Sequence, residues 1–185
     1  MKQSNWYRAA VLVCGALASG GEHAVAADDE NACMEGPMEQ FGRYVGDWKI
    51  EDQRLAQDGS AWGPGQGGRW IFECIGDGVA VQDFWHPNSG GYGTNLRIYN
   101  PDTKQWEIVW TAKGLNGLTH ISAIQDHDGN MRMDYVKPEQ DPPRRITFML
   151  PDESGWDWVM EISLDEGASW IAVFKIRATP WDDDE

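Results

Sequence analysis

The 185-residue chain holds 30 acidic and 15 basic residues, which gives a formal net charge of −15 at pH 7. This charge disfavours nucleic acids and anionic membranes as partners, because both repel a strongly acidic surface. The length suits a single domain with its own hydrophobic core.

Residues 1–26 have the form of a secretory signal peptide. Lys2 and Arg8 supply a positive start, the apolar run over residues 9–18 is too short to span a bilayer, and residues 24–26 form a small-x-small cleavage site. We therefore predict cleavage before Ala27 and export to the periplasm or the extracellular space, with a buried N-terminal helix as the alternative. No later run reaches the about 20 apolar residues of a membrane-spanning helix, so we expect no membrane span.

Cys33 and Cys74 remain after this cleavage. In an oxidising compartment such a pair predicts a disulfide, which would join the N-terminal segment to the second strand. Closing a loop of about 40 residues would contribute about 3–4 kcal/mol in the chain-entropy description. Two separate buried thiols are the alternative, because the sequence does not show the geometry that a disulfide requires.

The folded domain is expected to begin with a short helix. Residues 27–35 are polar, and we expect them to be flexible. Residues 36–45 carry Pro37 at the start and place apolar residues on one helical face, which predicts one or two helical turns. We expect the domain to span residues 36–180 and residues 181–185 to form an acidic tail.

From Gly46 onward, apolar and polar residues alternate with a period of two, in runs separated by glycine, asparagine, aspartate and proline turns. Asp77-Gly78 is typical of a tight hairpin turn. The glycine-rich segment 62–68 lacks the lysine and the following helix of a phosphate-binding loop, so we interpret it as an ordinary loop. About ten strands are expected, at residues 46–57, 69–75, 79–86, 94–99, 105–112, 118–125, 131–136, 145–150, 156–164 and 170–178.

The connections between these strands decide the fold class. They are too short to hold a crossover helix, so the strands must be antiparallel. A meander of this length would expose two long edges unless it closes. We therefore predict an all-β chain that forms an antiparallel up-and-down β-barrel with a short N-terminal helix, and a two-sheet sandwich is the alternative.

The first and last strands carry a resemblance to known barrels. Gly46-Asp47-Trp48 is similar to the Gly-x-Trp motif of the lipocalin and calycin barrels, and Arg177 matches the basic residue that packs across that tryptophan. Segments 93–99, 106–110 and 161–170 resemble DUF1579, a family of secreted bacterial lipocalin-like domains of unknown function. This resemblance implies a barrel with a ligand cavity and no established reaction. We expect Arg177 to stack on Trp48 where the barrel closes.

Tryptophan is the most informative residue type for function. Trp70, Trp85, Trp110 and Trp158 lie in predicted strands, on faces that alternate with polar residues. They either pack a solid core or line a cavity for a flat or apolar molecule, which a wide barrel can hold. We take these four tryptophans, together with Arg97, as candidate ligand-binding residues.

The polar faces of the same strands offer candidates for catalysis. Glu161 or His120 could act as an acid or base, and Arg97 could stabilise an anion, provided that all three meet in one cavity. The alternative is that these faces form the solvated exterior of the barrel. Sequence alternation alone does not decide which face is inside.

No cofactor or metal is predicted. The histidines show no paired metal-ligand spacing, and residues 126–130 lack the glycine and glutamate positions of a calcium loop, so we interpret them as a hairpin turn. No Gly-x-Ser-x-Gly elbow supports a hydrolase. Some related small barrels bind haem through a histidine near the C-terminus, but no histidine follows His127.

Three functions are compatible with these observations. The first is an exported barrel that binds a small, apolar or aromatic molecule in its lumen. The second is an enzyme, of isomerase, hydratase or cyclase type, that performs acid/base chemistry on a small organic substrate. The third is a structural or interaction module with a filled lumen and an exposed apolar patch. The sequence leaves a homodimer open.

Overall fold

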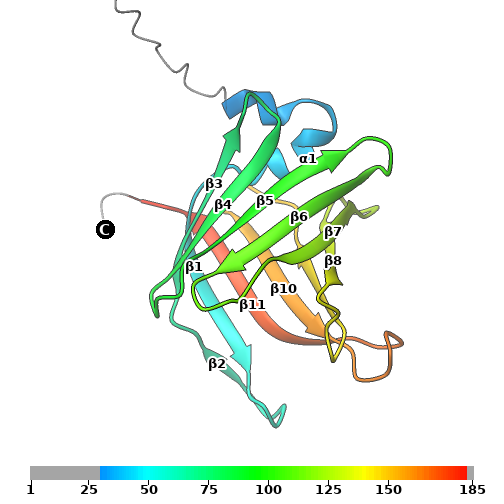
Figure 1. Cartoon of the computed structure of the whole chain (residues 1–185). Coiled ribbons are helices and arrows are strands. Elements are labelled where there is room, and N and C mark those ends of the chain that lie inside the picture. Colours follow the sequence, from blue (N-terminus) through cyan, green and yellow to red (C-terminus); the bar gives the residue numbers. More distant parts are fainter. Residues whose placement is uncertain (1–29, 183–185) are drawn as a thin grey trace, which may run out of the picture.

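The computed structural model describes residues 30–182. The predicted signal peptide, the start of segment 27–35 and the last three residues of the acidic tail lie outside the described residues. The described chain forms an antiparallel barrel that α1 (Glu39–Gly42) covers at one end (Figure 1). No helix in this part of the chain has the length and the apolar character needed to cross a membrane.

Ten strands close the barrel, and an eleventh is added at its edge. Each strand pairs with its neighbour in sequence from β3 to β11, and β1 pairs with both β3 and β11. Within residues 30–182, the short β2 pairs only with the end of β1. The predicted all-β barrel is therefore confirmed. The strands are β1 (Gly46–Leu55), β2 (Trp62–Pro64), β3 (Gly68–Ile75), β4 (Ala80–Pro87), β5 (Gly93–Asn100), β6 (Gln105–Ala112), β7 (Thr119–Gln125), β8 (Met131–Lys137), β9 (Arg144–Phe148), β10 (Trp156–Ile162) and β11 (Ile171–Pro180).

The predicted turn chemistry explains why the meander has short hairpins. Asp77 and Gly78 both adopt positive φ, 55° and 84°, as the favoured two-residue hairpin turns require. Residues 126–130 also form the predicted hairpin turn, in which the backbone N–H of Asp126 donates to the carbonyl of Asn130 at 2.9 Å. The glycine-rich segment differs from our expectation, because it holds the three-residue strand β2.

The barrel closes between β1 and β11, but not through the predicted arginine stack. Arg177 pairs with Glu51 and Ile50 pairs with Ala178, so alternate residues of both strands face opposite sides of the sheet. Ile50 and Ala178 are buried, whereas Arg177 donates to Ser154 on the exterior. The expected contact between Arg177 and Trp48 was therefore wrong. The Trp48 indole instead donates to the carbonyl of Tyr44 at 2.8 Å, which ties the barrel to the preceding turn.

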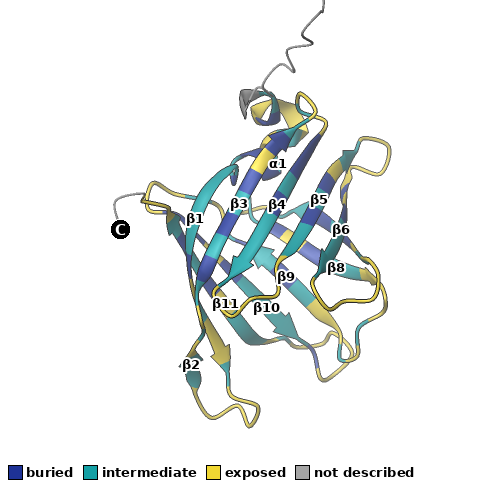
Figure 2. Ribbon diagram, turned by 60° about the vertical axis from the view of Figure 1, so that its left-hand side comes forward, coloured by how far each residue is buried: buried dark blue, intermediate teal, exposed yellow. Residues whose placement is uncertain are grey.

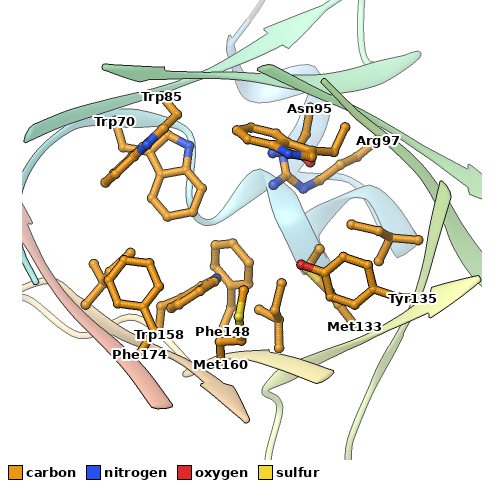
Figure 3. Close-up of a pocket in the computed structure, with 14 residues that line it drawn as sticks. Trp70, Trp85, Asn95, Arg97, Met133, Tyr135, Phe148, Trp158, Met160 and Phe174 are labelled. Atoms are coloured by element: carbon orange, nitrogen blue, oxygen red, sulfur yellow. The ribbon is translucent and has the colours of Figure 1, made fainter. Parts of the chain in front are cut away.

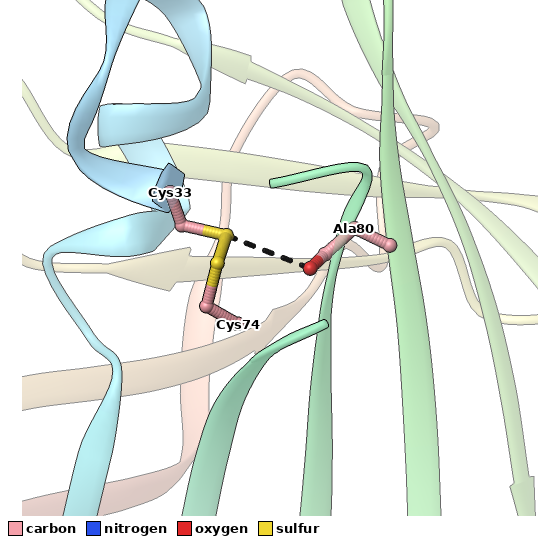
Figure 4. The surroundings of a disulfide bond; sticks show 3 residues. All are labelled: Cys33, Cys74 and Ala80. Carbon is pink, nitrogen blue, oxygen red and sulfur yellow. Dashed lines mark hydrogen bonds between the residues drawn. A yellow bond between two sulfur atoms is a disulfide. The ribbon is translucent and has the colours of Figure 1, made fainter. Parts of the chain in front are cut away.

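The N-terminal segment is held against the barrel by a disulfide. Residues Glu30–Met34 of segment 27–35 form the 3-10 helix η1. Cys33 of η1 bonds to Cys74 of β3, with a Cα–Cα distance of 5.7 Å, which confirms the predicted pairing (Figure 4). A second 3-10 helix, η2 (Gly36–Met38), continues into α1. A Cβ on Gly42 would overlap the carbonyl oxygen of Cys33, so glycine permits η1 and α1 to pack closely.

Aromatic side chains fill the half of the lumen beneath α1. Phe41 of α1 contacts Trp106 and Phe148 edge to face, with ring centroids 4.9 and 5.9 Å apart. Tyr44 is also fully buried, and its hydroxyl donates to the carbonyl of Met149 at 3.0 Å. Along the strands, buried residues alternate with more exposed ones, as β3 illustrates (Figure 2). Side chains therefore fill the lumen beneath α1, which leaves its other half for a cavity.

Candidate functional site

A cavity of about 160 Å³ occupies the half of the lumen away from α1. Fourteen side chains line it, drawn from strands on all sides of the barrel (Figure 3). Most of them are aromatic or aliphatic, and the aromatic wall consists of Trp70, Trp85, Trp110, Tyr135, Phe148, Trp158 and Phe174. Their inward direction follows from the period of two, since every second residue of a barrel strand points into the lumen.

The cavity has an inner end and a mouth. At the inner end, Phe148 and Arg97 are 1% and 0% exposed and adjoin the aromatic plug beneath α1. Trp85, Trp110 and Phe174 are only partly buried. Trp85 lies near the end of β4, where it pairs with Gly93 at the start of β5. The opposite end of β4 begins after the turn between β3 and β4, and that turn lies against η1. The mouth therefore opens at the end of the barrel opposite α1.

Arg97 is a charged side chain buried in this apolar surrounding. Its guanidinium forms an ion pair with Asp83, and both side chains are fully buried. Asn95 holds the carboxylate of Asp83 in place, because its side-chain amide donates to both oxygens at 3.1 and 3.0 Å. The guanidinium also lies over the rings of Phe41 and Phe72, at 5.0 and 5.1 Å from their centroids. Charge pairing and cation–π contacts together offset part of the cost of removing water from Arg97.

The hydrogen bonds of Arg97 are nevertheless incomplete. Its Nη1 contacts the carboxylate of Asp83, whereas Nε and Nη2 have no hydrogen-bond partner within residues 30–182. The indole Nε1 of Trp70, another lining residue, is buried and without a partner in the same part of the chain. A buried donor without an acceptor costs about 1–3 kcal/mol. The wall at the inner end of the cavity therefore contains buried, unsatisfied donors among apolar side chains.

The structure brings together all the residues predicted to bind a ligand. Trp70, Trp85, Trp110, Trp158 and Arg97 each line the cavity. Sequence analysis missed Asp83 and Asn95, although a signal was present. Asp83 shares its strand face with Val81 and Trp85, and Asn95 shares its face with Arg97, so polar residues interrupt otherwise apolar inward faces.

The candidate catalytic residues do not meet. His120 is exposed on β7. Glu161 is paired with Arg145, with 2.6 Å between its Oε2 and the Nε of Arg145, and neither of them lines the cavity. Of the three candidates only Arg97 lies in the cavity, so the convergence that acid/base catalysis requires is absent from the described residues.

The one acidic hydroxyl in the cavity wall is a poor proton carrier. Burial raises the pKa of Tyr135 above its usual value, and the nearby charge of Arg144 opposes this shift. Tyr135 therefore stays protonated at neutral pH and can only donate or accept a hydrogen bond. Among the described residues that line the cavity, no histidine, carboxylate, lysine or cysteine occurs.

A cluster of possible metal ligands lies elsewhere, in the turn between β7 and β8. Asp126, His127 and Asp128 each place one ligand atom within 4.8 Å of the others. His127 and Asp128 are exposed, however, and the carboxylate oxygens of Asp126 accept hydrogen bonds from Asn130 within the turn. The hydrogen bonds of the turn therefore account for the closeness of these three side chains.

Comparison with known proteins adds no assignment to this site. Neither a protein-family model nor a curated protein matches the sequence.

Proposed function

We propose that this protein binds a small, largely aromatic molecule in the open half of its lumen. The observation that carries the proposal is the division of the lumen: aromatic side chains fill one end, while the other holds a cavity lined by indoles and unsatisfied buried donors. A protein with a purely structural role gains nothing from such a cavity, since an unfilled core site costs stability. Pockets with an apolar wall and a few polar groups are typical of small-molecule binding.

The size of the cavity sets the size of the ligand. Its volume is about 160 Å³, and an engineered apolar cavity of about 150 Å³ binds benzene. One aromatic ring with a small substituent therefore fits without rearrangement. Haem, long-chain lipids and multi-ring dyes are too large for the cavity as it stands.

The resemblance to the lipocalin-like DUF1579 family and the export of the protein belong to the same proposal. A closed antiparallel barrel with a short helix across one end supports the family resemblance. The disulfide between Cys33 and Cys74 supports folding in an oxidising compartment. A binding protein in such a compartment would meet small aromatic molecules from outside the cell.

Thermal denaturation in the presence of single-ring aromatic compounds tests the proposal. A ligand that binds only the folded state stabilises it by about 2.7 kcal/mol at 100 times its dissociation constant. Native mass spectrometry of the gently purified protein would show a bound molecule directly.

A cavity-filling variant provides the specific control. Ile146 lines the cavity, so Ile146→Trp should fill it and abolish the stabilisation by ligand. Thr147 follows it on the same strand and faces the other side of the sheet, so Thr147→Trp should leave binding intact. Absence of binding by the wild-type protein, or equal binding by both variants, would refute the proposal.

A further inference from the structure

We propose that the ligand is an uncharged aromatic molecule whose hydrogen-bond acceptor, such as a carbonyl oxygen, binds the unpaired N–H groups of Arg97. This inference rests on the proposed function and adds the chemical class of the ligand. It concerns the inner end of the cavity, where Arg97 extends from β5 toward the interior (Figure 3).

The need for an acceptor follows from the donors that the fold leaves unsatisfied. Nε and Nη2 of Arg97 form adjacent donors on one planar group, and neither has a hydrogen-bond partner among the described residues. The rings of Phe41, Phe72 and Phe148, which lie within 5.7 Å of the guanidinium carbon, offer only their π faces. An oxygen acceptor of a bound molecule would accept the hydrogen bonds that these N–H groups can donate.

The absence of charge on the ligand follows from Asp83. The ion pair between Arg97 and Asp83 is fully buried, so the positive charge is already neutralised inside the barrel. A carboxylate bound at Arg97 would add a second negative charge near Asp83 without a second buried cation among the described residues that line the cavity. Burying an uncompensated charge is costly, whereas a carbonyl oxygen accepts the same hydrogen bonds without it.

The two ends of the cavity orient such a molecule. The acceptor would lie at the inner end against Arg97, and the ring would lie toward the mouth between the indoles of Trp85 and Trp110, which are only partly buried. Edge-to-face and offset contacts with these rings stabilise an aromatic ligand. The arrangement selects for one ring that carries one acceptor group.

Three probes of nearly equal size separate these requirements: acetophenone, isopropylbenzene and benzoate. Acetophenone has a neutral acceptor, isopropylbenzene has none, and benzoate carries a charge. A hydrogen bond to a charged group favours acetophenone over isopropylbenzene by about 10- to 100-fold in dissociation constant. Benzoate should bind at least about 10-fold more weakly than acetophenone. Calorimetry measures all three constants, and the carbonyl stretching frequency of bound acetophenone should fall relative to that in an alkane solvent.

Paired variants assign the effect to Arg97. The double variant Arg97→Met/Asp83→Asn removes both charges together, and acetophenone should then lose its advantage over isopropylbenzene. Arg145→Met/Glu161→Gln removes a pair that does not line the cavity, so the preference should persist. If the first double variant does not fold, two measurements on the wild-type protein still test the acceptor inference. They are the ranking of the three dissociation constants and the carbonyl stretching frequency of bound acetophenone.

Each outcome has a separate meaning. Equal or tighter binding of isopropylbenzene to the wild-type protein would overturn the acceptor inference and leave the proposed function standing. Tighter binding of benzoate than of acetophenone would overturn the claim that the ligand is uncharged. A preference that survives in the Arg97→Met/Asp83→Asn variant would overturn the role of Arg97. Failure of all three probes to bind would overturn the proposed function itself.

Discussion

Breaking the buried pair of Arg97 and Asp83 from either side should destabilise the protein far more than removing both members. The Arg97→Met variant leaves the carboxylate of Asp83 buried with only Asn95 as a partner. The Asp83→Asn variant leaves the guanidinium buried with its remaining contacts to three phenylalanine rings. Each single change should cost about 3–5 kcal/mol, the cost of an uncompensated buried charge.

The double variant should recover most of this loss. Methionine is apolar and flexible enough to fill the space of the arginine among the aromatic rings. Asparagine at position 83 keeps the oxygen that accepts from the backbone N–H of Asn95, a contact of 3.3 Å in the wild-type protein. Replacing a buried ion pair with groups of similar volume is often neutral or stabilising.

Denaturant and thermal melts of the wild type, the two single variants and the double variant measure the coupling between Arg97 and Asp83. For a domain of this size, each 1 kcal/mol shifts the melting temperature by about 2–4 °C, so each single variant should melt about 6–20 °C below the wild type. The double variant should be at least about 2 kcal/mol more stable than either single variant. Costs that add within about 0.5 kcal/mol would refute the reasoning, because independent residues behave additively.

Three further predictions concern the scaffold and the cavity mouth. Replacing both Cys33 and Cys74 with serine should lower the unfolding free energy by about 3–4 kcal/mol, which melts with and without reductant would check. A Cβ at position 93 would overlap the ring of Trp110, so Gly93→Ala should displace that indole, cost about 1–3 kcal/mol and change the tryptophan fluorescence, whereas Gly63→Ala meets open space and should be silent. Burial raises the pKa of Tyr44 and of Tyr135, so the folded state keeps protons that the unfolded state loses above about pH 10. Stability should therefore fall by up to about 1.4 kcal/mol per pH unit for each tyrosine above that pH, and urea melts at pH 9 and pH 11 that gave equal stability would contradict this.

The sequence alone determined the class of fold and identified five of the fourteen residues that line the cavity. The period of two, the short turns and the absence of crossover helices permit only antiparallel neighbours, and closure protects the two outer edges. The two cysteines that remain after the predicted cleavage led to the prediction of the bond between Cys33 and Cys74, which the structure contains. The tryptophans were found because large aromatic residues in alternating strands must face a packed core or a cavity.

Only the tertiary structure decided which faces point inward and which strands bring polar residues together. Arg177 lies outside because its register opposite Glu51 places it on the solvent side of the sheet, whereas Arg97 lies inside against Asp83 of the neighbouring strand. Alternation specifies that every second residue shares a face, but register and closure are set by contacts between residues far apart in sequence. The disulfide between Cys33 and Cys74 holds the N-terminal segment, with α1, at one end of the barrel. The aromatic side chains of that segment therefore fill the half of the lumen at that end.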